Sequence, residues 1–352
     1  MTAADTPVRR TRRGHGRATL DDVAALAEVT KITVSRFLRE PERVAEATAA
    51  RIRAALEATG YVPNKQAGLL ASGRSAIVAA LIPNLGHSIF GETVQALTEG
   101  LQAAGLELLL TSTGYSAQRE EEQLRALLGW APAAIVVTGR QHTPGALALL
   151  RQAHAAGTPV LEVWDHHTGH AADFAQIGFD HAQVGRAMAR HLLDAGHHRL
   201  AYLDSGVAAD FRAHERGAAF AAEARRAKAE VTLLAAATGD PFEAGRQACA
   251  TLRALPAVPT AVACANDHLA CGLLLEAQAR GLAVPRELAL LGFGDFPVGR
   301  QLQPALSTVR PPSPEIGRAA AHAIVEALGH GEPARDQVLP WQLLARASTA
   351  MA

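Results

Sequence analysis

The sequence predicts a small all-α head that contains a helix-turn-helix, followed by a larger, two-lobed α/β body. Apolar residues recur at helical spacing within residues 18–63, whereas β-branched runs alternate with amphipathic segments from residue 76 onward. The length of 352 residues also suits a small head and a large body better than a single domain. We therefore expect an N-terminal arm over 1–17, the head over 18–63, a hinge over 64–75 and the body over 76–352.

Three short helices are expected in the head. Thr19 is a good cap for the first helix, and Thr30 for a second helix over Lys31–Leu38. A third helix, over about 47–59, should end at Gly60, because glycine readily takes the left-handed conformation that closes a helix. The first two helices, joined by a tight turn, form the helix-turn-helix.

The outer face of the second helix is the candidate DNA-reading surface, and it carries Lys31, Ile32, Thr33, Ser35 and Arg36. In helix-turn-helix proteins this helix meets base edges in the major groove. Lysine or arginine can donate to guanine and isoleucine can contact a thymine methyl, whereas the two hydroxyls suit phosphate contacts. The alternative is a three-helix bundle whose basic face is merely solvated.

The charge distribution favours a nucleic-acid partner for the head. Residues 1–75 hold 13 Lys and Arg against 8 Asp and Glu, a net charge of +5, and the neutral chain therefore carries −5 elsewhere. The arm over 1–17 is basic but has no apolar run, so we interpret it as a phosphate-contacting arm or a plain tail, not a signal peptide. We expect a cytoplasmic protein without a membrane span, whose three cysteines are reduced core residues.

Eight apolar runs in the body are interpreted as strands: AIVAALI, LELLL, AIVVT, VLEVW, LAYLD, EVTLL, AVACA and ALLGF. The pattern restarts near residues 177–180, which predicts one lobe over about 76–173 plus 307–345 and a second over about 174–306. In open α/β sheets, ligands bind beyond the carboxyl ends of the strands. Trp164 and Asp165 follow one such strand and suit a sugar-like ligand, although Trp164 can equally be a core residue.

Several motifs, in order, resemble the LacI/GalR family of bacterial repressors: TLDDVAALAEVTKITVSRFLREPERV, GYVPNKQAGLLASGRS, ALIPNLGHSIF, IGFDHAQVGRAMARHLLDAGHHRLAYL, ACANDHLACGLLLEAQARGLAVPRELALLGFGD and LSTVRPP. The resemblance covers nearly all of the chain after the arm. It implies a periplasmic-binding-protein-like body and a homodimer on palindromic operator DNA. Glu28 stands where the family usually has glycine and Ala45 where it has a Ser or Thr cap, which bears on the stability of the head.

The resemblance also assigns DNA-binding roles outside the second helix. In the family, the segment after the third helix folds on operator DNA, and a leucine wedges into the minor groove. Leu70 is the matching residue, and Asn64 in the same segment and Thr19 in the head are further expected DNA contacts. From the residues alone, a plain linker with two exposed leucines is as good an interpretation.

For the effector, the resemblance implies contacts by Phe90, Arg216 and the pair Asn266 and Asp267. Arg216 matches an arginine that grips the ligand, and a guanidinium can hold a carboxylate in a bidentate fork. Asp267 matches a residue that accepts from ligand hydroxyls, although it can also cap the following helix. Phe90 can equally pack against the helix that follows it.

Four stretches, VTKITVSRFLR, LTSTGYSAQREEEQLRALLGW, VVTGRQHTP and LEVWD, resemble most closely the gluconate operon repressor branch, with 2-ketogluconate-responsive repressors a near second. A sugar acid such as gluconate or 2-ketogluconate needs a cationic partner, which Arg216 with Arg140 or His142 can supply. Arg140 follows the strand AIVVT. The alternative interpretation is that Arg140 is a solvated charge in a loop.

No enzyme, metal or cofactor site is expected. The chain lacks a G-x-S-x-G elbow, GFGDFPVG lacks the spacing of a nucleotide-binding loop, and the adjacent histidines do not have the spacing of metal ligands. We expect a repressor that a sugar acid releases from its operator. The alternatives are a regulator that responds to a neutral sugar or other metabolite, and a sugar-acid-binding protein or enzyme of the same fold without a DNA role.

Overall fold

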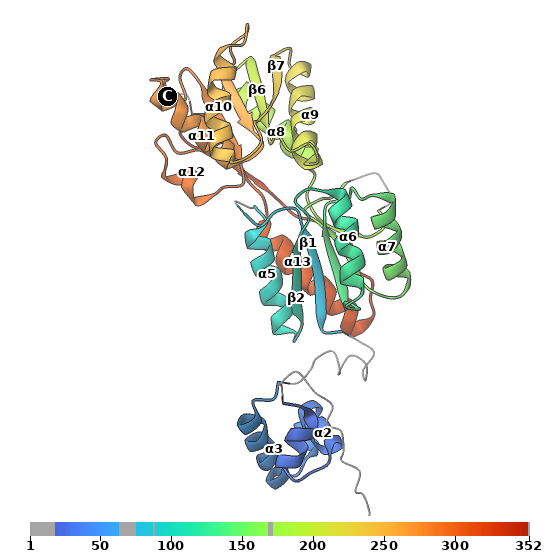
Figure 1. Cartoon of the computed structure of the whole chain (residues 1–352). Helices are drawn as coiled ribbons and strands as arrows, with labels where there is room; N and C mark the ends of the chain where they lie inside the picture. Colours follow the sequence, from blue (N-terminus) through green and yellow to red (C-terminus); the bar gives the residue numbers. More distant parts are fainter. Residues whose placement is uncertain (1–17, 63–74, 87–88, 168–171, 351–352) are drawn as a thin grey trace, which may run out of the picture. The chain divides into compact units, whose positions relative to one another are not determined.

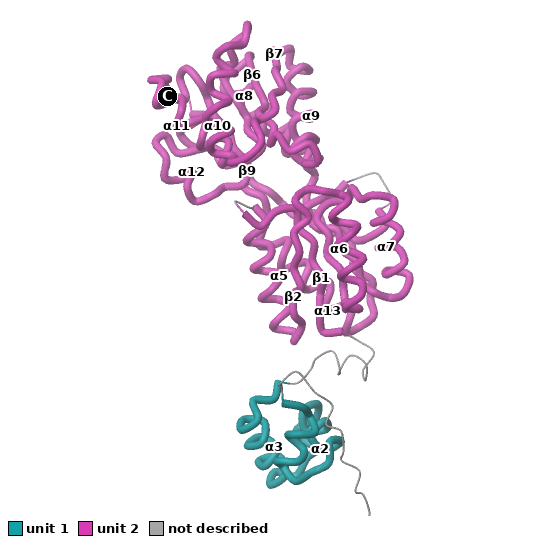
Figure 2. Tube along the Cα trace, in the orientation of Figure 1, with its two compact units in different colours: residues 1–74 teal, residues 75–352 magenta. Residues whose placement is uncertain are grey.

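A computed structural model describes residues 18–62, 75–86, 89–167 and 172–350 (Figure 1). The chain divides into two compact units, residues 1–74 and 75–352 (Figure 2). The first unit contains the head and the second contains both sheets of the body.

The head has the three expected helices, α1 (Leu20–Leu26), α2 (Lys31–Arg39) and α3 (Glu46–Thr59), with a short 3-10 helix η1 (Pro41–Arg43) after α2. Thr19 caps α1 in a capping box: its side chain accepts from the backbone N–H of Asp22, and the Asp22 carboxylate accepts from that of Thr19. The Thr30 side chain caps α2 by accepting from Thr33 N–H, and Gly60 ends α3 with a φ of +59°. The predicted caps are confirmed.

Val23, Val34 and Ile52, one from each helix of the head, are fully buried together and form the centre of its core. The two departures noted in the sequence have local consequences. Glu28 takes a φ of +52° in the turn between α1 and α2, a conformation that costs a non-glycine residue free energy. Ala45 begins α3 without a side-chain hydrogen bond to the free N–H groups of the first turn.

The first sheet of the body has the strand order β11-β5-β4-β3-β1-β2, and all of its pairs are parallel. Its strands are β1 (Ile77–Ile82), β2 (Glu107–Ser112), β3 (Ala134–Thr138), β4 (Val160–Val163), β5 (Ala175–Gly178) and β11 (Gln337–Val338). One core cluster lies between this sheet and α6 (Ala117–Leu128) and α7 (Pro144–Ala155). On the other side, α5 (Gly91–Ala103) packs against α13 (Ser313–His330).

The second sheet has the order β12-β10-β9-β8-β6-β7, with only β12 antiparallel to its neighbour. Its strands are β6 (Arg199–Asp204), β7 (Glu230–Ala235), β8 (Ala261–Cys264), β9 (Ala289–Phe293), β10 (Ser307–Arg310) and β12 (Gln342–Leu344). Two helix pairs pack with it, α8 (His181–Asp194) on α9 (Phe211–Arg226) and α10 (Pro241–Arg253) on α11 (Asp267–Ala279), and α12 (Pro297–Gln301) follows β9. Figure 1 shows these pairs around the upper sheet.

The eight predicted strands are all present, but the predicted lobe boundaries at 174 and 307 are wrong. β5 still belongs to the first sheet, so the chain crosses to the second lobe only before α8. β10 belongs to the second sheet, and the chain returns to the first lobe only after β10, at α13. The chain then crosses to the second lobe once more, between β11 in the first sheet and β12 in the second. β5 has only four residues, including the polar Gln176, so no β-branched run marked it.

Cys249, Cys264 and Cys271 are buried free thiols, as the sequence predicted. Among the residues that the structure describes, no helix combines the length and the apolar character that crossing a membrane requires.

Candidate functional site

The outer face of α2 presents the residues predicted to read DNA. Val34 points into the core, which leaves Lys31, Ile32 and Arg36 exposed on the other side of the helix, with Thr33 and Ser35 half-buried between them. The Ile32 side chain is 70% exposed, and no core contact requires an isoleucine there. An apolar side chain standing alone on a basic surface fits contact with a thymine methyl.

The two cations of this face differ in their present partners. Lys31 Nζ lies 2.9 Å from Asp21 Oδ2 of α1, in an exposed ion pair of the kind that contributes little to stability. The Arg36 side chain is exposed and has no hydrogen bond or ion pair with any described residue, so its guanidinium is available to a base or a phosphate. Thr19 is engaged in the capping box of α1. Asn64 and Leu70 lie outside the described residues.

In the body, Trp164 stands at the carboxyl end of β4 inside an aromatic cluster. Its ring is 1% exposed, its Nε1 donates to Thr93 Oγ1 over 3.0 Å, and its ring centre lies 4.9 Å from that of Phe90 and 6.0 Å from that of Phe179. The φ of Trp164 is +67°, in the left-handed region. A side chain at Gly178 would collide with the backbone of Trp164 and Asp165. In this structure Trp164 and Phe90 are core residues, as in the alternative to a ligand-binding role that the sequence left open for each of them.

Asp165, directly after Trp164, belongs to an ion-pair network that joins the two lobes. Arg140, which follows β3, donates to Asp165 and also to Glu215 Oε1 of α9, 3.0 Å away. Burial raises the pKa of Asp165 to about 6, against the opposing effect of Arg140 and Arg212. Asp165 Oδ2 and Glu215 Oε2 are buried without a hydrogen-bond partner among the described residues, so two acceptors remain free in this network.

The His142 ring lies between two glutamates of the first lobe. Its Nδ1 lies 2.6 Å from Glu120 Oε1 and its Nε2 lies 3.4 Å from Glu162 Oε1. Burial lowers the pKa of His142, but its hydrogen bonds with Glu120 and Glu162 outweigh burial and raise it to about 9. The protonated ring is thus neutralised by two carboxylates, which leaves it poorly suited to grip a ligand carboxylate.

Arg216 and Arg212 lie one turn apart on the buried face of α9, with only 3% and 4% of each residue exposed. Arg216 donates to Ala265 O and to His181 Nδ1, both over 3.0 Å, and its guanidinium carbon lies 4.0 Å from the ring centre of Phe293. His181 Nε2 lies 2.8 Å from Trp164 O. Burial and the neighbouring Arg216 lower the pKa of His181, so its neutral ring donates at Nε2 and accepts at Nδ1.

Arg212 reaches from the second lobe to the end of the first sheet. Its Nη1 donates to Thr138 O of β3 over 3.3 Å, and its guanidinium carbon lies 4.9 Å from the ring centre of Phe211 and 5.7 Å from that of Phe90. No carboxylate among the described residues lies within 4.0 Å of Arg212 or Arg216. Neither buried guanidinium is therefore directly paired with a carboxylate, although Arg212 acts on Asp165 at longer range, and Arg216 Nε has no hydrogen-bond partner among the described residues.

Asn266 and Asp267 begin α11 with distinct roles. Asn266, not Asp267, caps the helix, because its Oδ1 accepts from Leu269 N–H over 3.0 Å. Asp267 is buried and accepts from Thr308 Oγ1 over 2.6 Å and from Phe296 N–H over 2.8 Å. Burial raises its pKa to about 7. Both carboxylate oxygens already have partners in the protein, so Asp267 fixes the loop after β9 in this structure.

Sequence reasoning missed Arg212, Glu215 and His181. The spacing of Arg212 and Arg216, four residues apart in a helical segment, was a usable signal that both lie on one face. Glu215 and His181 carried no such signal, because their roles arise from partners in other elements, Arg140 and Trp164.

Comparisons with known proteins agree over nearly all of the chain. The family described as "Bacterial regulatory proteins, lacI family" matches residues 19–64, and "Periplasmic binding protein-like domain" matches residues 189–349. The "HTH-type transcriptional regulator GntR" of Pseudomonas aeruginosa is 37% identical over 342 residues, which cover 96% of this chain and 97% of that protein. The protein of the same name from Escherichia coli K12 is 31% identical, with 92% and 95% covered.

Among solved structures, a LacI-family transcriptional regulator from Silicibacter pomeroyi is similar over 95% of this chain and 100% of its own. Its TM-score is 0.87 at 31% sequence identity. Head and body therefore occur together in a known regulator of the same architecture.

Proposed function

The chain belongs to the LacI family of bacterial regulatory proteins, and we propose that it represses a sugar-acid utilisation operon from which a sugar acid releases it. The predicted resemblance to this family and to its gluconate operon repressor branch is confirmed by the relatives. So are the helix-turn-helix head and the periplasmic-binding-protein-like body. The relatives are DNA-binding transcriptional regulators and not enzymes, as the sequence predicted.

The observation that carries the proposed effector is the buried pair Arg212 and Arg216. A buried charge is costly unless it is paired, and arginine stays protonated in proteins. Neither guanidinium has a carboxylate within 4.0 Å among the described residues, although both are at least 96% buried. A ligand carboxylate held between them would supply the missing negative charge in a charge-assisted pair.

The neighbouring groups support a hydroxylated ligand. Asp165 Oδ2 and Glu215 Oε2 are buried acceptors without a donor among the described residues, and sugar hydroxyls would supply the donors. Phe211 lies beside Arg212 and is only half-buried, so its ring can contact the C–H groups of a sugar, whereas Phe293 is fully buried beneath Arg216. A carboxylate with several hydroxyls, as in gluconate or 2-ketogluconate, meets both requirements, whereas a neutral sugar leaves the two cations unpaired.

The sugar acid releases the protein from its operator if ligand binding favours an arrangement of the two lobes that the DNA-bound protein does not adopt. Arg140 and Arg212 already reach across the lobes, to Glu215 and to Thr138 O, so a ligand at these residues would contact both lobes. We propose a homodimer that places two α2 helices on a palindromic operator, with Leu70 of each hinge in the minor groove. Thermodynamic linkage then requires that operator DNA weaken sugar-acid binding by the same factor by which the sugar acid weakens operator binding. This factor corresponds to a coupling free energy of typically about 1–3 kcal/mol.

Thermal unfolding of the purified protein with gluconate, 2-ketogluconate, glucose and other sugars tests the effector class. A ligand of the folded state raises its stability by RT ln(1 + [L]/Kd), so an effector should shift the melting temperature with concentration. We expect a shift with at least one sugar acid and not with glucose. A shift with neutral sugars alone would establish the alternative, a LacI-family regulator with a neutral effector.

A further inference from the structure

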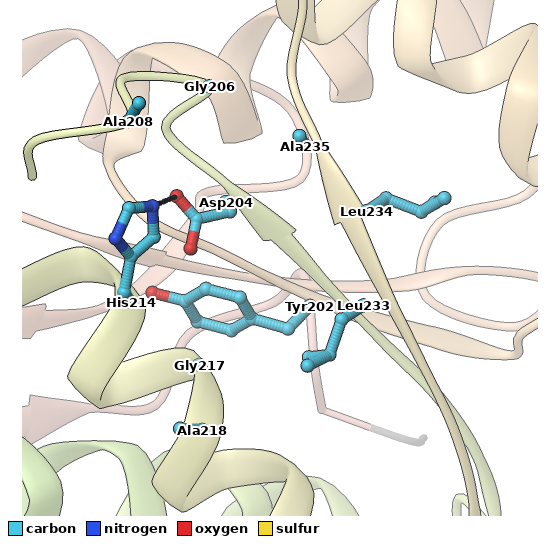
Figure 3. A pocket seen from close by; sticks show the side chains of 10 residues that line it. All are labelled: Tyr202, Asp204, Gly206, Ala208, His214, Gly217, Ala218, Leu233, Leu234 and Ala235. Atoms are coloured by element: carbon cyan, nitrogen blue, oxygen red, sulfur yellow. Dashed lines mark ion pairs between the residues drawn. The ribbon is translucent and has the colours of Figure 1, made fainter. Parts of the chain in front are cut away.

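A cavity in the second lobe lies against α9 and is lined by residues other than Arg212 and Arg216 (Figure 3). Its volume of about 400 Å³ is within the range of small-molecule sites. Strands β6 and β7, the loop after β6 and helix α9 line it. Arg212 and Arg216 are absent from its lining, because they occupy the buried face of the same helix. The cavity therefore has a different lining from the proposed sugar-acid site, although Tyr202, which lines it, also contacts Arg216.

Most of the lining is apolar. The Tyr202 ring forms the floor and packs directly on the backbone of α9, because Gly217 has no side chain there. Small residues on α9 and in the loop keep the cavity open, among them Ala218 and Ala208. Leu233 on β7 lines the cavity and is 48% exposed, which leaves a large apolar side chain in water when the cavity holds only solvent.

One end of the cavity is polar and acidic. Asp204, the last residue of β6, faces His214 of α9, and Figure 3 shows the pair at the rim above the Tyr202 ring. The distance between Asp204 Oδ1 and His214 Nε2 is 3.5 Å, which is long for an ion pair, and the His214 side chain is 45% exposed. Asp210, the buried cap of α9, adds a second negative charge that acts on Asp204. Burial raises the pKa of Asp204, so a closer cation would stabilise its ionised form.

We propose that this cavity is a second small-molecule site, which binds a compact amine with its apolar body against Tyr202 and Leu233 and its ammonium group on Asp204. The exposed His214 imidazole moves aside, and the ammonium takes its place at the carboxylate. A carboxylate at one end of an apolar cavity selects a cation, because a neutral isostere leaves the charge unpaired and an anion is repelled.

Fluorine NMR of the full-length protein with 4-fluorobenzylamine tests the proposal, with 4-fluorobenzyl alcohol as the neutral isostere. We expect saturable broadening of the amine signal at millimolar concentration or below. The alcohol should bind roughly tenfold more weakly, because it lacks the charge-assisted hydrogen bond. Absence of amine binding, or equal binding of the two compounds, would overturn the proposal.

Three variants locate the site. Ala218→Phe fills the cavity from an exposed helix position and should abolish amine binding, and Asp204→Asn should weaken it by roughly tenfold. The matched control is Ala222→Phe, on an exposed position one turn further along α9 and outside the lining, which should bind as the wild type does. Circular dichroism verifies that each variant folds. Unchanged amine binding in folded Ala218→Phe or Asp204→Asn would place the amine elsewhere and refute the site.

Discussion

Replacing Arg212 by Met separates a ligand-binding arginine from a structural one. Within the described part of the chain, the Arg212 side chain hydrogen-bonds to Thr138 O over 3.3 Å and to the Tyr115 hydroxyl, and it makes no ion pair. Loss of these two hydrogen bonds costs about 1–3 kcal/mol, and removal of an unpaired buried charge offsets most of that cost. We therefore expect the free energy of unfolding without ligand to change by no more than about 1 kcal/mol.

The affinity for the sugar acid should respond much more strongly. A hydrogen bond to a charged group contributes about 1.5–3 kcal/mol, so Arg212→Met should weaken sugar-acid binding by roughly 10- to 150-fold. Isothermal titration calorimetry with the sugar acid that stabilises the wild type measures this loss, and urea unfolding measures the stability.

The matched control is Arg140→Met, which removes a guanidinium that does have carboxylate partners. It leaves Asp165 and Glu215 without their cation, so it should destabilise the protein more than Arg212→Met does. If Arg212→Met instead lost several kcal/mol of stability and bound the sugar acid as the wild type does, the unpaired guanidinium would be structural and the reasoning wrong.

Three further predictions concern the head and the first lobe. Arg36→Ala should weaken operator binding by about 1–3 kcal/mol if Arg36 reads a base, and anisotropy titrations should show a smaller loss on random DNA; equal losses would make it a phosphate contact. Glu28→Gly should raise the stability of the head by about 1 kcal/mol in thermal unfolding, because glycine takes the φ of +52° without strain; a fall would mean that backbone strain at Glu28 is not significant. The raised pKa of His142 adds stability that is complete below its unfolded value of 6.5 and is lost as pH rises towards 9, on the order of 3 kcal/mol. Urea unfolding across this range should show the loss in the wild type and not in His142→Gln, and equal pH profiles would refute the assignment.

The head and most of the strands could be predicted because their signals are local. Thr19, Thr30 and Gly60 determine helix ends through their own backbone and side-chain chemistry. The eight apolar runs each coincide with a strand, and all of these strands except β2 and β7 are largely buried. β5 and β10 were assigned to the wrong lobe because sheet membership depends on the crossings of the chain, which no local pattern records.

The candidate effector site was predicted only in part, for a related reason. Asp165 closely follows a strand, where position along the chain indicates the cleft, whereas Arg216 lies inside α9, which begins at Phe211. Arg140 and His142 were expected to hold a carboxylate, but both contact acids that come from distant elements. Whether a buried charge is free or neutralised depends on partners brought by the fold, so the sequence could name the cations but not their partners.

The most direct test of the central claim is operator release. Operator fragments selected by the wild-type protein from random DNA would be labelled and titrated by fluorescence anisotropy with and without gluconate, 2-ketogluconate and glucose. The account predicts that one of the sugar acids weakens operator binding by roughly 5- to 150-fold and that glucose does not. Operator binding that neither sugar acid changes, or that glucose weakens instead, would contradict it.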